Sequence, residues 1–484
     1  MSAAERPSKR TSVLALGASA IGVVIATLSA FYLASIATTL VHRGRYHEVI
    51  AQAVRTGALA RAHRLPFGSG EPYAIHNFND CLILSMLILP QDDNALLRAL
   101  SPAVPADGAP WSGVSPAGYP PYVQCRDLEV AMVSAHAVTT NLYHRYLHGD
   151  WVLAKALLAI MPLSAATNAM ALLVGLLFLS LAALAARRLI GGTGEQPRER
   201  AYLALGLVLF SFSALPVFAW SFSFAPSDIM IAGALLFFYL RPPSSLTDRR
   251  LVVAAALFGT LTALFEFLTG SAPMGLMAVI AVIAFDDGGS VRQLLRRLVL
   301  AAAAFGGAIV LSFAIKMAAV SLIWGVSELG IFGRQIGAHM NASGWDIARQ
   351  NEAQLNRLGI SVDAIRQSVM LSYGYALSKI VYFTKLMAFG SATLGVILAV
   401  ILPLALACLS AWQALRAQDP LQRLRISLVL GGCLVMPVWY LAFIHHTIVH
   451  AHFMFRPLVW PLALLVAMQA WSKRSLQKAE RAPA

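Results

Sequence analysis

The stretch ISLVLGGCLVMPVWYLAFIHHTIVHAHFMFRPLVWPLALLVAMQAWS, residues 426–472, decides the fold class of this chain. An apolar run ends at residue 444, a polar cluster occupies 445–456, and a second apolar run begins at Pro457. A bilayer core requires about 20 apolar residues for each helical crossing. The stretch therefore predicts two membrane helices joined by histidine and arginine side chains that lie at one membrane surface.

The rest of the chain has the composition of a membrane protein. Of its 484 residues, 58% are hydrophobic and only 12% are charged, and the mean hydropathy is +0.68. Soluble globular domains carry far more charge. The net charge of +14 does not indicate a nucleic-acid partner, because Lys and Arg fall in short clusters between apolar runs. We expect an all-α polytopic membrane protein that binds no nucleic acid.

About ten apolar runs qualify as transmembrane helices. Basic clusters recur in alternate connectors, and the positive-inside rule places these clusters and both termini in the cytoplasm. The first run follows basic residues but has no convincing cleavage site, so we interpret it as a retained signal anchor. The expected crossings are residues 12–41, 164–186, 201–221, 226–241, 251–269, 271–285, 298–324, 386–412, 426–444 and 457–472.

These crossings divide the chain into six parts. They are a cytoplasmic tail with the signal anchor (1–41), a first external loop (42–163), crossings two to seven (164–324), a second external loop (325–385), crossings eight to ten (386–472) and a cytoplasmic tail (473–484). External loops of this length usually serve a function. We therefore expect the functional site on the external side of the membrane.

The external loops contain apolar stretches that are too short to cross a bilayer. Leu82–Pro90 and Trp151–Pro162 are expected to run along the outer membrane surface as interfacial helices. The amphipathic stretch Trp345–Arg366 is expected to pack over the external entrance. Cys81 and Cys125 lie in the first loop, where an oxidising compartment favours a disulfide. Metal-binding spacings such as CxxC do not occur in the sequence.

Asp80 is the leading candidate for a general base. It follows His76-Asn77-Phe78-Asn79 and precedes an apolar run, so partial burial would raise its proton affinity. The alternative is a helix N-cap, since short polar side chains at such a position accept bonds from free amides.

Arg145 and His148 form a second candidate pair, placed just before an apolar run. At i, i+3 spacing they share a helix face, and a guanidinium beside an imidazole suits a phosphate. The alternative is a belt of residues that anchors the segment to lipid headgroups.

Three charged residues interrupt apolar runs: Asp228 and Glu266 near the external side, and Lys316 midway along residues 311–324. Charges within membrane segments are costly and usually face a cavity or a partner. Asp228 is also a candidate helix cap. Lys316 has two open roles, substrate binding or neutralisation of Glu266.

The terminal cluster contains two pairs at i, i+4 spacing, His446 with His450 and His452 with Arg456. Side chains at this spacing share a helix face and are able to hold a phosphate. The rival interpretation is a zinc site, but no carboxylate accompanies the histidines within the segment. We therefore expect no cofactor, although a divalent metal is not excluded by the spacing.

In its architecture and in three short segments, the chain resembles integral-membrane glycosyltransferases of the GT-C fold. The architecture of a signal anchor, a large first external loop with an Asp, and about ten helices is similar over most of the chain. The segments RYLHG (145–149), FEFLTG (265–270) and HHTIVHAHFMFR (445–456) look like parts of poorly described bacterial members. The paired acidic motif that many members carry directly after the first helix is absent; Asp80 comes late, and Asp92-Asp93 is an alternative.

The resemblance implies transfer of a sugar from a polyprenyl-phosphate carrier to a glycan, lipid or protein acceptor. The reaction would take place at the periplasmic face of the bacterial inner membrane, among membrane lipids. Asp80 would deprotonate the acceptor. Arg145, His148, His446, His450, His452 and Arg456 would bind the carrier phosphate and stabilise the charge that develops on it.

Two other functions remain open on sequence grounds. A polymerase or ligase of lipid-linked glycans would also hold a polyprenyl diphosphate with external Arg and His residues. A flippase or transporter would predict internal repeats and several charges deep in helices. The sequence shows no repeat, and Lys316 is the one deep charge.

Overall fold

The computed structural model describes residues 12–38, 43–56, 59, 63–64, 72–73, 77–105, 128, 130–134, 138–144, 146–192, 196–213, 215–265, 270–341, 352–357, 359, 361–388 and 390–472. This part of the chain is built of helices, with two small antiparallel ribbons. In one, β1 (His63–Arg64) pairs with β2 (Pro72–Tyr73). In the other, β3 (Ala103–Pro105) pairs with β4 (Thr140–Leu142). The expected helical class is confirmed for the described residues, apart from these ribbons.

Five helices are long and apolar enough to cross a membrane. Leu172 on the second and Leu404 on the fourth are 63% and 62% exposed, and large exposed apolar side chains of this kind suit contact with lipid. The five are α1 (Val13–Ala37), α7 (Leu163–Gly191), α13 (Val291–Trp324), the continuous helix of α19 (Ala392–Val396), η6 (Ile397–Ile401) and α20 (Leu402–Arg416), and α21 (Pro420–Ala442).

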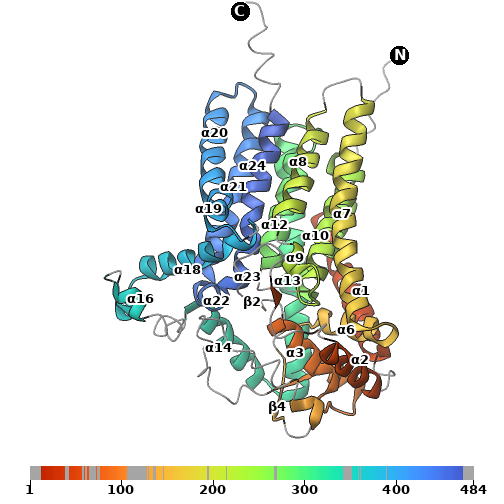
Figure 1. Cartoon of the computed structure of the whole chain (residues 1–484). Helices are drawn as coiled ribbons and strands as arrows, with labels where there is room; N and C mark the ends of the chain where they lie inside the picture. The colour runs from red at the N-terminus through yellow and green to blue at the C-terminus, as the bar shows by residue number, and fades with distance from the viewer. Residues whose placement is uncertain are drawn as a thin grey trace, which may run out of the picture.

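The other five expected crossings coincide with shorter helices. Their 13 to 17 residues extend about 20–26 Å, whereas the hydrocarbon core is about 30 Å thick. Figure 1 shows the four labelled ones upright in the same bundle as the long helices. They are α8 (Pro197–Phe212), α10 (Ala225–Leu240), α11 (Asp248–Leu264), α12 (Ala272–Ala284) and α24 (Val459–Ser472), of which α11 is not labelled.

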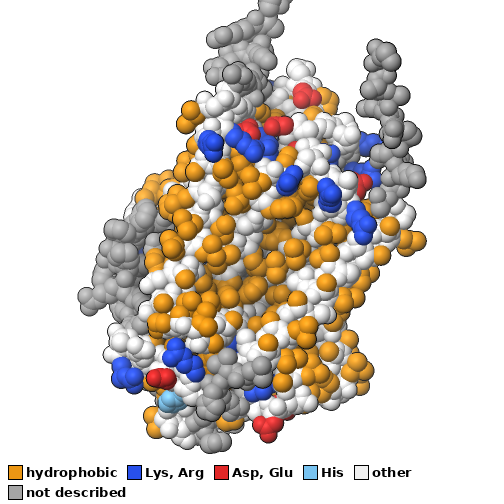
Figure 2. Space-filling view, turned by 90° about the vertical axis from the view of Figure 1, so that its right-hand side faces the viewer, with side chains coloured by type: hydrophobic (Ala, Val, Ile, Leu, Met, Phe, Trp, Pro, Cys, Tyr) orange, Lys and Arg blue, Asp and Glu red, His pale blue; other side chains and the backbone are white. Residues whose placement is uncertain are grey.

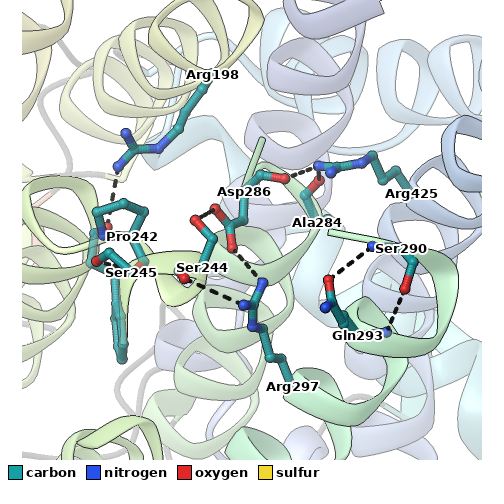
Figure 3. Close-up of polar contacts among 11 residues, drawn as sticks. Arg198, Pro242, Ser244, Ser245, Ala284, Asp286, Ser290, Gln293, Arg297 and Arg425 are labelled. Atoms are coloured by element: carbon teal, nitrogen blue, oxygen red, sulfur yellow. Dashed lines mark hydrogen bonds and ion pairs between the residues drawn. The ribbon is translucent and has the colours of Figure 1, made fainter. Parts of the chain in front are cut away.

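The surface of the bundle is divided by polarity. Figure 2 shows a broad band of hydrophobic side chains around the middle, with many Lys and Arg side chains towards the upper end and a smaller group at the lower end. Several basic residues at this end cap helix C-termini, whose last carbonyl groups lack partners within the helix. Arg425 donates to the carbonyl oxygens of Ala284 and Asp286 at the end of α12 (Figure 3). Arg198 donates to those of Phe238 and Tyr239 at the end of α10.

Carboxylates balance this basic end of the molecule. Arg297 lies 3.5 Å from Asp286, whose other oxygen accepts from Ser244 at 2.6 Å (Figure 3). Ser244 belongs to η3 (Pro243–Ser245). The basic clusters that indicate the cytoplasmic side therefore also fasten neighbouring helices to one another.

Shorter elements gather at the opposite, lower end of the bundle in Figure 1. The first external loop supplies α2 (Arg43–Arg55), α3 (Asn77–Ile88), α4 (Ala95–Leu100) and α6 (Gly149–Ile160). The second supplies α14 (Ser327–Asn341), α16 (Glu352–Arg357), α17 (Val362–Gln367), α18 (Val369–Phe383) and η5 (Thr384–Leu386). The connectors between long helices supply α9 (Leu215–Phe218), α22 (Ile444–Val449), α23 (Ala451–Met454) and η7 (Arg456–Leu458).

The placement of α3 differs from the expected interfacial helix. Cys81, Leu84 and Leu87 are buried, and so are most other side chains of this helix. The helix packs against α2, α6 and β3. It is therefore a core element of the external part, because its residues are apolar on all sides and a helix of that kind is stable only when protein or lipid surrounds it.

Candidate functional site

Asp80 occupies the first turn of α3 and points into the protein. Asp80 is only 5% exposed. The oxygen Oδ1 accepts a hydrogen bond from the Ser221 hydroxyl at 2.8 Å and another from the backbone N–H of Ser223 at 3.2 Å. Since Asp80 lies inside the helix and accepts from a distant segment, the N-cap alternative is wrong.

The proton affinity of Asp80 is set by opposing effects. Burial raises its pKa to about 7, and the nearby negative charge of Asp150 raises it as well. The bonds from Ser221 and Ser223 act in the other direction because they favour the ionised carboxylate. The group is therefore able to take up a proton near neutral pH, which is the property required of a general base.

Ser221 and Ser223 were not singled out by the sequence analysis. They lie in the segment Trp220-Ser221-Phe222-Ser223-Phe224, between α9 and α10. The N–H of Ser223 also donates to the Ser221 oxygen at 3.1 Å, which fixes the shape of the turn. The available signal was the alternation of small hydroxyl residues with aromatic residues between two apolar runs.

Asp228 and Arg456, which are far apart in sequence, form a buried ion pair. The Arg456 nitrogen Nη2 lies 2.6 Å from Asp228 Oδ1 and also donates to the Ser227 hydroxyl at 2.7 Å. Arg456 is 1% exposed and Asp228 is 4% exposed. The same nitrogen donates to the carbonyl oxygen of Phe224 at 3.4 Å. The pair therefore joins η7 to the first turn of α10. This turn directly follows the segment Trp220–Phe224, which we call the serine turn.

Two glycines bring the three motif segments together. A Cβ atom on Gly149 would lie 2.6 Å from the carbonyl oxygen of Leu264 and 3.1 Å from Cδ1 of Phe265. Gly270 has a φ of +131°, and a Cβ atom there would lie 2.5 Å from Cγ of Pro457. Gly149 is required because two backbones approach closely, and Gly270 because of its positive φ and the nearby ring of Pro457. Segment 145–149 thus touches the start of segment 265–270, whose end touches the residue after Arg456.

These contacts form a series of neighbouring groups, which we call the external circuit. It runs from Asp80 through the serine turn to the Asp228–Arg456 pair, then by Pro457 to Gly270, and from Phe265 to Gly149. The neighbour of Gly149, Asp150, returns to Asp80 through its electrostatic effect. Asp80, Asp228 and Arg456, three residues selected from the sequence, therefore belong to one structural unit.

His148 lies at the edge of the circuit, immediately before α6. Its backbone is left-handed, with a φ of 58°, and its Nε2 lies 2.7 Å from the carbonyl oxygen of Tyr143. Burial, followed by the charge of Lys316, holds its pKa well below the usual value. The neutral ring therefore donates from Nε2 and has an acceptor at Nδ1. This state does not supply the positive charge expected for phosphate binding.

Lys316 lies on α13 and is buried. Its ammonium group donates to the carbonyl oxygen of Leu100, at the end of α4. It also affects His144 and His148 electrostatically. The contact favours a capping role for Lys316, while its expected partner Glu266 lies outside the described residues, as does Arg145.

The terminal histidines lie on α22, on α23 and, for His450, at the junction between them. The His446 and His450 rings are 4.5 Å apart, as the i, i+4 spacing predicts, and His446 is buried. The side chain of His452 lies outside the described residues. Among the described residues, no group of three or more His, Cys, Asp or Glu side chains is arranged to hold a metal ion. The zinc interpretation gains no support from this part of the chain.

The described cysteines differ in their bonding state. Cys81 is disulfide-bonded, whereas Cys408 and Cys433 are free. Cys125, the expected partner of Cys81, lies outside the described residues. A disulfide at Cys81 would fasten α3 next to Asp80.

Comparisons of the chain with protein-family models, with curated proteins and with solved structures found no match. The functional interpretation therefore depends on the residues themselves.

Proposed function

We propose that this chain is an integral-membrane glycosyltransferase of the GT-C type. It moves a sugar from a polyprenyl-phosphate carrier to a glycan, lipid or protein acceptor at the periplasmic face of the bacterial inner membrane. Ten helices cross the membrane in this proposal, and both termini are cytoplasmic. The basic end of the bundle in Figure 2 supports this orientation, because basic residues favour the cytoplasmic side.

The external circuit is the observation that carries the proposal. It brings a buried carboxylate with a pKa of about 7 into one unit with the three segments that resemble the family. The circuit lies at the end of the bundle opposite the basic clusters. That end is the side on which a carrier lipid would present its sugar to a periplasmic acceptor.

The reaction assigns a separate task to each group. Asp80 takes the proton of the acceptor hydroxyl while the oxygen of that hydroxyl bonds to the anomeric carbon. The bond from that carbon to the carrier phosphate breaks, and the phosphate leaves with the electron pair. The histidines of α22 and α23, with Arg145, then offset the charge on the phosphate.

Arg456 is given a different task from the one expected from sequence alone. Its guanidinium already bonds to Asp228, Ser227 and the Phe224 carbonyl. These contacts favour a positioning residue, which holds the serine turn against Asp80. The direct phosphate contact expected for Arg456 stays a prediction that donor binding can test.

Purified protein reconstituted in lipid vesicles provides the test of activity. It is incubated with polyprenyl-phosphate hexoses that carry radiolabelled sugars, with water or a simple alkyl glycoside as acceptor. We expect release of the sugar from the monophosphate carrier. Matched polyprenyl-diphosphate hexoses serve as the comparison. Turnover with the diphosphate alone would indicate a ligase or polymerase, and movement of intact donor across the bilayer without cleavage would contradict a transferase.

A further inference from the structure

Helix α18 lacks the charged outward side of a water-exposed helix and carries large apolar residues there instead. Its outward residues include Val369, Met370 and Leu371, of which Met370 is 83% exposed. Further along, Gly374, Ser378 and Tyr382 continue the exposed side at i, i+4 spacing. The outward side carries no formal charge over the length of the helix.

The inward side of α18 holds its buried polar groups. Ser372 is buried and donates to the carbonyl oxygen of Ile365 at 2.6 Å. Tyr375 and Ile380 are also buried on this side. The ammonium group of Lys379, the one charged residue of the helix, lies 5.7 Å from the centre of the Tyr375 ring. Water would favour a charged outward side, whereas here the exposed residues are uncharged and the one charge lies partly buried on the inward side.

Helix α2 provides a contrast within the same external part. Its outward residues include Glu48, Gln52 and Arg55, whereas Val49 and Ile50 face the core. This is the ordinary pattern of a helix that faces water. The two helices therefore meet different surroundings, although both belong to the external end of the chain.

The exposed apolar side of α18 continues into the candidate membrane-spanning helices. The hydroxyl of Tyr373 donates to the carbonyl oxygen of Pro437 on α21 at 3.1 Å. Next to that contact, Val438 and Leu441 of α21 are exposed apolar residues. At its other end α18 passes through η5 into the α19–α20 crossing, and Lys385 of η5 donates to the Tyr382 hydroxyl at 3.2 Å. A tyrosine beside a lysine is typical of a membrane–water interface.

From this arrangement we infer that α18 lies in the outer leaflet of the bilayer, with its outward side against phospholipid. Figure 1 shows α18 running across the bundle rather than along it. A helix of this kind lies in the plane of the interface. Its inward side packs against α22 and α23, so the terminal histidines lie at headgroup depth. The inference goes beyond the proposed reaction and does not depend on it.

Depth-dependent quenching tests the placement without any substrate. Single cysteines replace Met370 and Ser378 on α18, and Glu48 and Gln52 on α2, in the full chain with Cys408→Ser and Cys433→Ser. Each is labelled with an environment-sensitive fluorophore and reconstituted in phosphatidylcholine vesicles with or without spin-labelled lipid. Size-exclusion profiles and thermal unfolding verify that each variant is folded.

We expect spin-labelled lipid to quench Met370→Cys and Ser378→Cys several-fold more strongly than the two α2 positions. Aqueous iodide should show the reverse order. Equal quenching by iodide at Met370→Cys and Glu48→Cys would place α18 in water and overturn the inference. Protection of the α18 positions from both quenchers would show that protein, such as a second copy of the chain, covers this side instead of lipid.

Discussion

At the scale of single residues, the balance of burial and hydrogen bonding at Asp80 controls the chemistry. Burial raises its pKa to about 7, so the carboxylate becomes available as a base when the pH rises through that value. We expect turnover to increase with pH with a midpoint near 7.

The raised pKa of Asp80 has the opposite effect on stability, because the folded protein holds this proton more tightly than the unfolded chain. The stability that the folded protein gains by holding this proton is therefore lost as the pH rises through about 7.

Ser221→Ala tests this balance. The variant removes a hydrogen bond that favours the ionised carboxylate, so the midpoint of the pH–rate curve should move to higher pH. Turnover should be reduced at pH 7 and recover at alkaline pH. Ser164→Ala, at an exposed position on α7, is the control and should leave the midpoint in place. An unchanged midpoint in Ser221→Ala would separate the activity from this hydrogen bond.

The Asp228–Arg456 pair yields a second prediction at this scale. Loss of one partner from a buried pair leaves an uncompensated charge and costs about 3–5 kcal/mol. Asp228→Asn and Arg456→Gln should therefore each lower the thermal unfolding temperature strongly. The double variant should be less destabilised than the sum of the two, because neither charge remains.

Donor binding separates the two roles considered for Arg456. A positioning residue should leave the affinity for a polyprenyl-phosphate hexose nearly unchanged in the double variant. A direct phosphate ligand would instead cost about 1–3 kcal/mol of binding free energy, the range for a charge-assisted hydrogen bond. A loss of this size, with folding intact, would show that Arg456 binds the donor phosphate directly.

At the scale of elements, close backbone contacts hold the external circuit together. Gly149→Ala places a methyl group 2.6 Å from the Leu264 carbonyl oxygen, and such overpacking costs about 1–3 kcal/mol. We expect a lower unfolding temperature and reduced turnover. Gly233→Ala on α10 is the matched control, since nothing lies within 4 Å of its added Cβ. Equal behaviour of the two variants would show that the approach of α6 to α11 does not matter for activity.

The sequence predicted elements better than it predicted their surroundings. Apolar runs located the long helices because length and hydropathy suffice for that purpose. They did not show that α3 is enclosed by protein, since Leu82–Pro90 was expected at the membrane surface, and α18 was not singled out as an interfacial helix. The shorter bundle helices were also hard to assign from hydropathy alone. A helix that is buried among its neighbours can be apolar and still be shorter than the thickness of the bilayer.

The candidate site was predicted in part for a related reason. Asp228 was found because charges are rare in apolar runs, and Arg456 was found because it belongs to a polar cluster between two apolar runs. Their pairing was not predicted, since 228 residues separate them in sequence. Ser221 and Ser223 were missed because serine is unremarkable in an apolar context. Only the fold shows that their donor groups converge on Asp80.

At the scale of the whole molecule, charge asymmetry predicts the orientation in the membrane. Reporter fusions test it. Alkaline phosphatase joined after Gly113 or Asn351 should be active, because both residues lie in loops expected outside. A fusion after Gln196, in the basic connector between α7 and α8, should be inactive. Activity in the reverse pattern would place the external circuit in the cytoplasm and contradict the proposed reaction.

The central claim is that Asp80 accepts the proton during sugar transfer. The most direct measurement compares Asp80→Asn with Asp93→Asn, which alters an exposed carboxylate in the same loop. Donor binding and single-turnover cleavage of a polyprenyl-phosphate hexose are measured on the same samples. We predict that Asp80→Asn binds donor normally but transfers sugar about 100- to 10,000-fold more slowly, the usual contribution of a general base. Asp93→Asn should resemble the parent. Full turnover in Asp80→Asn would contradict the account.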